Sequence, residues 1–443
     1  MSPREAVQSF LDRLREPCRI LVAVSGGSDS TGLLLSLHGI LAAEKAMGHS
    51  LVAATIDHAL RAEAASEAEA VSRQCAELAI PHVILRWSGE KPNSGISAAS
   101  REARYRLLME AADRFGADVI VTGHTLDDQI ETVAMRASRS EADANLGLAG
   151  MAEAVLLDRR CWLMRPFLKT RREAIRDYLR QSGRGWIDDP SNSDHHYERV
   201  RVREGLADQF DIPVETIQLA ARRRCQLADD AADLARRYLR VTHGVLAQLS
   251  PEFMNEQPEI LRHLLANLAA ILGGRQYLPA SATMDRVMAM LDRRVMGRMT
   301  AGRVIFDVRR EGLFLHRENR DLTAIEILKG QTQSWDERYR IENRSEVAIQ
   351  IGPTAAERRV ATIMFPDAPP AVAMRAMTVL PDIRPVLASL VTIDKASVIV
   401  EPILSPYDRF LPQFQLNLGC ELALLFGCDA LPAIPIKVFE RKS

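Results

Sequence analysis

The run Ser25-Gly26-Gly27-Ser28-Asp29-Ser30 combines glycines, hydroxyls and one carboxylate, a set suited to binding a phosphorylated ligand. Glycines let backbone N–H groups approach an anion closely. The serine hydroxyls can donate hydrogen bonds to phosphate oxygens, and Asp29 can help to hold Mg²⁺. We therefore predict a site for a magnesium-bound pyrophosphate. The alternative is a Gly-Gly turn followed by an Asp/Ser helix cap.

The residues on either side of this run favour the phosphate site. The apolar residues 20–24 predict a buried strand, and the leucine spacing after Thr31 predicts a helix. The chain contains neither G-x-x-x-x-G-K-[ST] nor G-x-G-x-x-G. The run instead resembles the loop of the PP-loop (N-type) ATP pyrophosphatases. That resemblance implies that ATP is cut between its α and β phosphates.

A second polar run, Gly123-His124-Thr125-Leu126-Asp127-Asp128-Gln129-Ile130-Glu131-Thr132, follows another expected strand. On a helix that begins near Leu126, Asp128 and Glu131 are i, i+3 neighbours, and Asp127 and Glu131 are i, i+4 neighbours. Crowded carboxylates are unfavourable unless a cation shares them, so the pattern predicts a metal ion or a substrate ammonium here. The alternative is ordinary acidic enrichment in a first helical turn.

Two weaker candidates lie nearby. Asp57 and His58 end the second expected strand, where the alternative is a surface turn. Arg101, Arg104 and Tyr105 share one face of a predicted helix. A guanidinium there could contact phosphate, and the alternative is a solvated helix face.

Strands and helices alternate along the first 125 residues, which predicts a parallel sheet with helices on both faces. The predicted strands are 20–24, 52–56, 82–86 and 118–122. The predicted helices are 29–46, 63–79, 96–115 and 126–138. Ligands of such sheets bind at the carboxyl ends of the strands. Each motif above follows a strand or lies early in a crossover helix, so the motifs can converge in one crevice.

The rest of the chain predicts smaller elements and further domains. We expect a short β pair before residue 165, a helix at 169–182, mostly helix over 213–295 and a hairpin at 303–307 and 311–316. The predicted domains are an α/β PP-loop ATP pyrophosphatase domain at 1–210, a mainly helical domain at 211–325 and a small C-terminal domain with β content at 326–443.

Composition indicates a globular protein that is not membrane-embedded. The chain has 443 residues, 47% of them hydrophobic and 26% charged, and a net charge of −1. It has no apolar run long enough for a membrane span and no signal-peptide pattern. Its six cysteines form no C-x-x-C pair, which argues against structural zinc and a disulfide framework. We expect a cytoplasmic protein.

Positive charge is concentrated locally. Residues 159–203 contain twelve Lys/Arg against six Asp/Glu. Arg199, Arg201 and Arg203 alternate, so on an extended segment all three side chains point the same way. Such a row suits a nucleic-acid backbone or the phosphates of ATP.

Taken together, the motifs resemble the tRNA(Ile)-lysidine synthetase family over about the first 205 residues. The resemblance rests on S-G-G-S-D-S (25–30), D-H-A-L-R (57–61), S-R-E-A-R-Y (100–105), G-H-T-L-D-D-Q-I-E-T (123–132), G-L-A-G-M (147–151), R-P-F-L (165–168), W-I-D-D-P-S-N (186–192) and R-V-R-V-R (199–203). The last two groups distinguish it from NAD and GMP synthetases, and the missing C-x-x-C pairs distinguish it from tRNA thiolases.

The resemblance implies an activity and a set of site residues. The wobble cytidine of the CAU-anticodon isoleucine tRNA is adenylated by ATP, and L-lysine then displaces AMP at C2. ATP contacts are implied for Ser25, Gly26, Gly27, Ser28, Asp29, Ser30, Asp57, Arg104, Gly123 and His124. Catalysis is implied for Asp29, Asp128 and Glu131, and Mg²⁺ binding for Asp29 and Asp128. Substrate contacts are implied for Asp128, Glu131, Arg199, Arg201 and Arg203. The resemblance also implies that the predicted domains at 211–325 and 326–443 bind tRNA.

Several points stay open at the level of sequence. Residues 136–146 are longer and more acidic than the family's usual loop, and we expect 139–146 to act as a lid. Asp128 could bind metal or act as a base, and the oligomeric state could be a homodimer. The alternative functions are another adenylating tRNA modification, such as thiolation, and an inactive RNA-binding scaffold. The clustered carboxylates argue against the scaffold.

Overall fold

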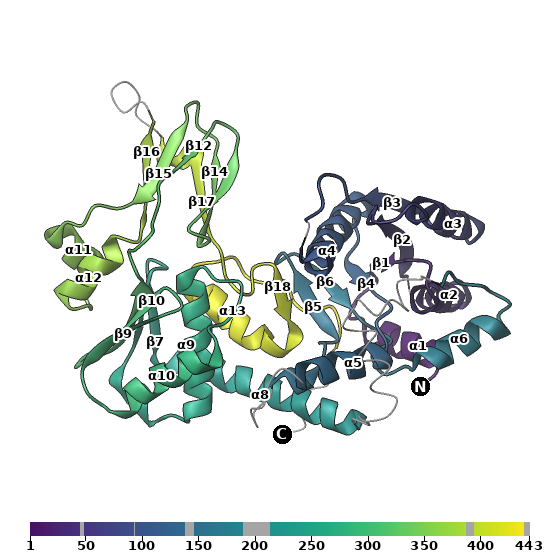
Figure 1. Ribbon diagram of the computed structural model, residues 1–443, viewed down its shortest axis with the longest axis horizontal. Coiled ribbons are helices and arrows are strands. Elements are labelled where there is room, and N and C mark those ends of the chain that lie inside the picture. Colours follow the sequence, from purple (N-terminus) through teal and green to yellow (C-terminus); the bar gives the residue numbers. More distant parts are fainter. Residues whose placement is uncertain (45–47, 93, 138–145, 189–212, 387–393, 438–443) are drawn as a thin grey trace. The chain divides into compact units, whose positions relative to one another are not determined.

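The computed structural model describes residues 1–44, 48–92, 94–137, 146–188, 213–386 and 394–437 (Figure 1). Its contacts divide the chain into two compact units. The first unit comprises Met1–Arg224, Pro412–Phe414 and Pro432–Ser443, and the second comprises Cys225–Leu411 and Gln415–Leu431. The boundary falls within helix α8 (Val214–Tyr238).

A sheet with the strand order β5-β6-β4-β1-β2-β3 organises the first unit. Its strands are β1 (Arg19–Ala23), β2 (Ser50–Asp57), β3 (His82–Arg86), β4 (Val119–Val121), β5 (Ala154–Leu157) and β6 (Cys161–Met164). The boundary between the units also falls within strand β18 (Phe410–Pro412). The pairs β1–β2, β1–β4, β2–β3 and β4–β6 are parallel, whereas β5–β6 is antiparallel. The predicted parallel sheet and the short β pair are confirmed, and each of the four predicted strands ends within two residues of the observed one.

The helices of this unit also match the sequence pattern. They are α1 (Pro3–Arg13), α2 (Ser28–Ala43), α3 (Ala64–Glu77), α4 (Ile96–Phe115), α5 (Leu126–Ala137) and α6 (Arg172–Gln181). Helix α4 packs against β1 to β4, while α1, α2 and α6 pack against one another. Figure 1 shows α2 and α4 on opposite faces of the sheet.

Burial on both faces explains the uninterrupted apolar sequence of the central strand. Ile20, Leu21 and Val22 have no exposed surface, and strands covered on both sides are apolar throughout. Because β1, β2 and β4 are parallel, their carboxyl ends meet at one edge of the sheet. The residues after Val24, at Asp57 and after Thr122 therefore lie along that edge.

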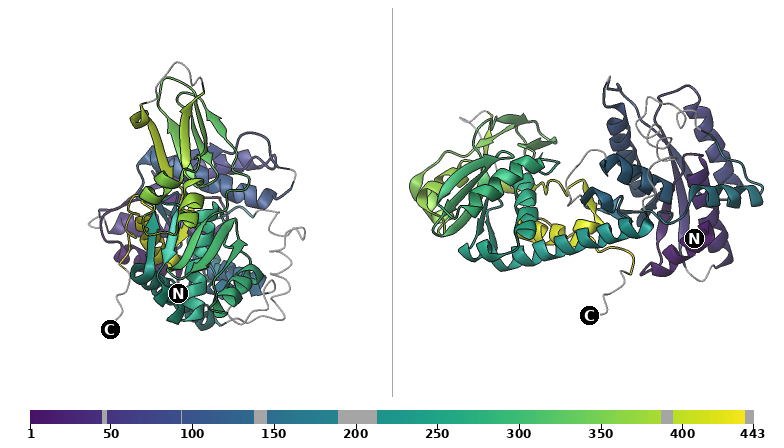
Figure 2. Two further views of the ribbon diagram at one scale, coloured as in Figure 1. Left: turned by 90° about the vertical axis from the view of Figure 1, so that its left-hand side faces the viewer. Right: turned by 60° about the horizontal axis from the view of Figure 1, so that its bottom comes forward.

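The second unit contains a five-stranded antiparallel sheet, in the order β7-β8-β11-β10-β9, and helices. These elements are β7 (Leu239–Thr242), β8 (Leu246–Leu249), α9 (Pro258–Gly273), α10 (Ser281–Asp292), β9 (Gly297–Ala301), β10 (Val304–Arg309) and β11 (Gly312–Arg317). The predicted hairpin is confirmed as β10 and β11. The sequence pattern did not predict β7, β8 and β9. Figure 2 shows this unit from two further directions.

Two three-stranded antiparallel sheets complete the second unit. Their strands are β12 (Ile325–Ile327), β15 (Ile349–Pro353) and β16 (Pro381–Pro385), and β13 (Thr332–Trp335), β14 (Tyr339–Asn343) and β17 (Val398–Pro402). The remaining helices are α11 (Arg358–Met364), α12 (Pro370–Met377) and α13 (Leu416–Leu425). One buried core joins Val245 and Phe314 to Ile341 and Val379. Residues from the predicted domains at 211–325 and 326–443 thus share one hydrophobic core. The division of the chain into three domains stays a prediction.

Among the described residues, no helix is both long enough and apolar enough to cross a membrane.

Candidate active site

The loop between β1 and α2 is held by its own hydroxyl groups. The Ser25 backbone N–H donates to Ser30 Oγ at 3.1 Å, and the two hydroxyl oxygens are also 3.1 Å apart. Thr31 Oγ1 donates to the Gly26 carbonyl at 3.2 Å. Helix α2 begins at Ser28, so its free N–H groups lie within the loop. Free N–H groups and hydroxyls at a helix N-terminus are the donors that an anion site needs.

Two glycines allow other segments to approach this loop. Gly26 has a φ of +86°, and a Cβ there would lie 2.7 Å from Ile187 Cδ1. The Ile187 N–H donates to the Gly26 carbonyl at 2.9 Å, which holds the segment beginning at Trp186 against the loop. A Cβ on Gly123 would lie 2.8 Å from the Asp29 carbonyl group. Gly123 is therefore required by the close approach of the Asp29 backbone, whereas Gly26 is favoured by its positive φ.

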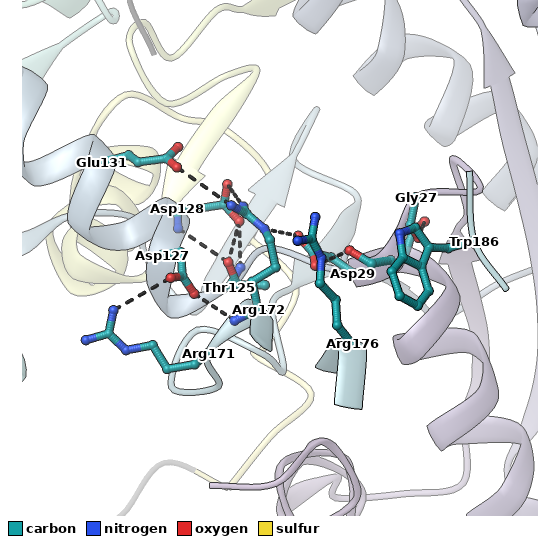
Figure 3. Close-up of polar contacts among 12 residues, drawn as sticks. Gly27, Asp29, Thr125, Asp127, Asp128, Glu131, Arg171, Arg172, Arg176 and Trp186 are labelled. Atoms are coloured by element: carbon teal, nitrogen blue, oxygen red, sulfur yellow. Dashed lines mark hydrogen bonds and ion pairs between the residues drawn. The ribbon is translucent and has the colours of Figure 1, made fainter. Parts of the chain in front are cut away.

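Arg172 joins three carboxylates from two different elements (Figure 3). Its Nε donates to Asp29 Oδ2 at 2.9 Å, and its Nη2 donates to Asp128 Oδ1 at 3.2 Å. Its Nη1 lies 3.8 Å from Glu131 Oε1. We call these four residues the Arg172 cluster. Asp29 and Glu131 thus face the same guanidinium, beside the phosphate-type loop.

Backbone contacts fix the position of the Arg172 cluster. The Arg172 N–H donates to Asp127 Oδ2 at 2.7 Å, which joins the start of α6 to the start of α5. The Leu126 N–H donates to the Thr170 carbonyl at 3.0 Å, a second link between these helices. Asp128 Oδ2 accepts from the N–H and the hydroxyl of Thr125 at 2.8 and 2.9 Å. Asp128 is therefore held by its own helix cap as well as by Arg172.

Burial makes the charges of the Arg172 cluster interdependent. Asp29, Asp128 and Glu131 retain 20%, 13% and 4% of their side-chain exposure. Burial raises the pKa of Asp29, Arg172 partly offsets this, and Asp128 raises it further. Burial alone would lower the pKa of Arg172, but the surrounding carboxylates raise it. With all groups ionised, one guanidinium faces three carboxylates, so the cluster keeps two negative charges.

Comparison with known proteins gives the family. Residues 3–210 match the model of a PP-loop, ATP-binding domain. The chain is 42% identical to the tRNA(Ile)-lysidine synthase of Rhizobium meliloti (strain 1021), covering 98% of this chain and 97% of the relative. It is 41% identical to that of Mesorhizobium japonicum, over 94% of each chain, and 38% identical to that of Brucella ovis, over 77% and 78%.

The chain belongs to the tRNA(Ile)-lysidine synthase family.

Membership of this family confirms the resemblance read from the N-terminal motifs and extends it through the C-terminal third, where the motifs matched only loosely. None of these relatives is a thiolase, so the alternative of thiolation finds no support among them.

The other residues expected in this family's site make contacts of their own. Asp57 Oδ1 accepts from the Ala59 N–H at 2.7 Å, so it shapes the turn after β2. The His124 ring contacts the Thr122 hydroxyl at 2.9 Å. The guanidinium carbon of Arg104 lies 5.7 Å from the ring centre of Tyr105. Arg199, Arg201, Arg203 and residues 139–145 of the predicted lid at 139–146 lie outside the described residues.

Arg172 itself was not predicted. From the sequence, Arg172 is only one of the basic residues in 159–203 and part of the helix predicted at 169–182. A cation in the first turn of a helix opposes the helix dipole, so this placement was a usable signal. Its partners come from residues more than 40 positions away, and only the fold brings them together.

The carboxylates of the cluster fit a magnesium ion shared with a phosphate. Among the described residues, no group of three or more His, Cys, Asp or Glu side chains could by itself hold a metal. Mg²⁺ in nucleotide sites usually takes one or two carboxylates together with phosphate oxygens and water. Asp29 and Asp128 supply two carboxylates that face one point at the Arg172 guanidinium. This donor set suits Mg²⁺ bound together with pyrophosphate.

Proposed function

We propose that the protein joins L-lysine to C2 of the wobble cytidine in the CAU-anticodon isoleucine tRNA, with ATP as the second substrate. The observation that carries this proposal is the meeting of Asp29, Asp128 and Glu131 at one guanidinium beside the loop at 25–30. A phosphate loop alone would suit many ligands. A buried site that keeps two negative charges suits a metal-bound nucleotide and an amine.

In the first step, the cytosine O2 attacks the α-phosphate of ATP, and the bond to the β-phosphate breaks to release pyrophosphate. The serines of the loop and the N-terminus of α2 bind the phosphates, and Asp57, Arg104, Gly123 and His124 complete the nucleotide site. Asp29 and Asp128 would hold Mg²⁺, and the bound ion would offset the negative charge of the leaving pyrophosphate.

In the second step, the lysine amine attacks C2 of the adenylated cytidine, the C2–O bond breaks and AMP leaves. Glu131, with Asp128, binds the lysine ammonium before the amine loses its proton. Arg172 stays against the same carboxylates and keeps their spacing. We also infer that Arg199, Arg201 and Arg203 contact phosphates and that residues 139–146 close over the adenylate, which water would otherwise hydrolyse.

The same proposal assigns a role to the rest of the chain and a location to the protein. The segments 211–325 and 326–443 bind the tRNA, and the protein acts in the cytoplasm, where tRNA is modified. A homodimer stays a prediction.

The test is a reaction of purified protein with ATP, Mg²⁺, lysine and the isoleucine tRNA transcript. We expect AMP release that needs both lysine and tRNA, and a tRNA nucleoside whose mass equals cytidine plus lysine minus water. Asp29→Asn is the control that should lose AMP release. AMP release that depends on a sulfur donor, or that needs no lysine, would contradict the proposal.

A further inference from the structure

A pocket of about 760 Å³ lies within the second unit, and none of its lining residues belongs to the site described above. Its lining comes from Gly302 and three segments: residues 274–279 between α9 and α10, residues 332–340 of the β13–β14 hairpin, and residues 403–409 after β17. All of them belong to one compact unit. Helices α9 and α10 and strands β14 and β17 can be located in Figure 1.

A buried group with excess positive charge adjoins this pocket. The Asp336 carboxylate, 3% exposed, contacts Arg303 and accepts from Arg317 Nη2 at 3.0 Å and from Arg338 Nε at 2.6 Å. Arg317 and Arg338 retain 1% and 4% of their side-chain exposure. One carboxylate therefore faces three guanidinium groups. Arg338 Nη1 is buried and has no hydrogen-bond partner among the described residues.

The pocket wall packs directly on this arginine group. A Cβ on Gly274 would lie 2.4 Å from the Asp336 carbonyl oxygen. Gly274 and Glu337, which flank the group, both line the pocket. Two uncompensated charges in a low-dielectric interior are costly and project positive potential outward. An anion in the pocket would be attracted by that potential.

The rim of the pocket supplies an aromatic surface and a further cation. Tyr277 is 81% exposed, although its ring is large and partly apolar. Arg275 is exposed, and no ion pair to it occurs within the described parts of the chain. Arg340, by contrast, is paired with Asp408 at 3.0 Å. The rim thus offers one ring for stacking and one guanidinium available for phosphate.

We propose that this pocket binds one unpaired nucleotide of the tRNA, with its base stacked on Tyr277 and its phosphate at Arg275. The inference rests on the proposed function, which makes tRNA the substrate. A ring beside a cation is the usual pattern for single-stranded RNA, because every base has a face that can stack and every nucleotide carries a phosphate. The arginine group beneath strengthens the attraction for that phosphate.

The test uses the full-length protein and compares Tyr277→Ala, Tyr277→Phe and Arg275→Ala. The control is Arg359→Ala, which removes an exposed arginine from α11 of the same unit, outside the pocket. We expect Tyr277→Ala to weaken tRNA binding roughly tenfold and Tyr277→Phe to bind as the wild type does. Arg275→Ala should lower the slope of log affinity against log salt by about one, and Arg359→Ala should not.

Two results would overturn the proposal. One is tRNA affinity within twofold of wild type for both Tyr277→Ala and Arg275→Ala. The other is an equal loss for Arg275→Ala and Arg359→Ala, which would indicate general surface charge. Failure of the proposed function looks different: the wild-type protein would form no lysidine at all, whatever its tRNA affinity. In the pocket variants, the rate at saturating tRNA should stay at the wild-type level, so the defect should be confined to KM for tRNA.

Discussion

At the scale of residues, the Arg172 guanidinium determines how the nearby carboxylates ionise. Arg172 lies 2.9 Å from Asp29 and opposes the rise in the Asp29 pKa that burial causes. Since Mg²⁺ binds the ionised carboxylate, activity should fall as Asp29 takes up a proton on the acidic side. Without the positive charge, that proton is taken up at a higher pH.

Replacing Arg172 therefore gives a pH prediction with a defined sign. Arg172→Met should move the acidic limb of kcat/KM for ATP upward by roughly one to two pH units, because an adjacent opposite charge lowers a carboxyl pKa by about that much. Arg172→Lys keeps the charge and should leave the limb near its wild-type position. If the acidic limb of the Arg172→Met profile stayed at its wild-type pH, protonation of Asp29 would not be what lowers kcat/KM for ATP.

Glu131 and Asp29 should fail at different steps. Glu131→Gln should raise KM for lysine by about tenfold or more, since a hydrogen bond to a charged group contributes about 1.5–3 kcal/mol. Its tRNA-dependent exchange of pyrophosphate into ATP should persist, because adenylation precedes lysine attack. Asp29→Asn should lose that exchange. If Glu131→Gln loses the exchange too, Glu131 serves the adenylation step and not lysine binding.

At the level of helices and strands, burial largely determines which strands the sequence predicts. Strands β1, β2 and β4 are largely buried apolar runs, so composition alone locates them. Strand β3 at the sheet edge is partly exposed, but its Val-Ile-Leu run still marks it as a strand. Strands β7, β8 and β9 carry mixed sequences, such as Leu-Arg-Val-Thr and Leu-Ala-Gln-Leu, which do not differ from the helical segments around them. The same limit applies to Arg172, whose role depends on residues that are distant in sequence.

Close packing of the 123–124 segment on the phosphate loop leads to a prediction about glycine. Gly123→Ala should destabilise the protein by about 1–3 kcal/mol and raise KM for ATP, since its Cβ would overlap the Asp29 backbone. Gly39→Ala is the matched control on α2, where a Cβ meets nothing within 4 Å. That change should stabilise the helix by about 0.5–1 kcal/mol. Urea unfolding measures the stability of each variant, and ATP titration measures its KM. Equal effects of Gly123→Ala and Gly39→Ala would contradict the close packing of Gly123 against the Asp29 backbone.

At the scale of the whole molecule, the two units contain separate sets of charged residues. The Arg172 cluster lies in the first unit, and the arginine group around Asp336 lies in the second. Units with their own cores can unfold in separate steps. A ligand that binds only one native unit stabilises that unit. An ATP analogue with Mg²⁺ should therefore raise the melting temperature of the first unit only.

Asp336→Asn tests this separation. The change leaves three guanidinium groups without their shared carboxylate, and breaking a buried ion pair costs about 3–5 kcal/mol. We expect calorimetry to show a lower melting temperature for the transition that the ATP analogue does not shift, with the ATP-sensitive transition unchanged. Arg359→Ala, which alters only an exposed side chain of the same unit, should leave both transitions in place. If Asp336→Asn lowered both transitions equally, the two units would unfold together, and stability would have to be treated as one property of the chain.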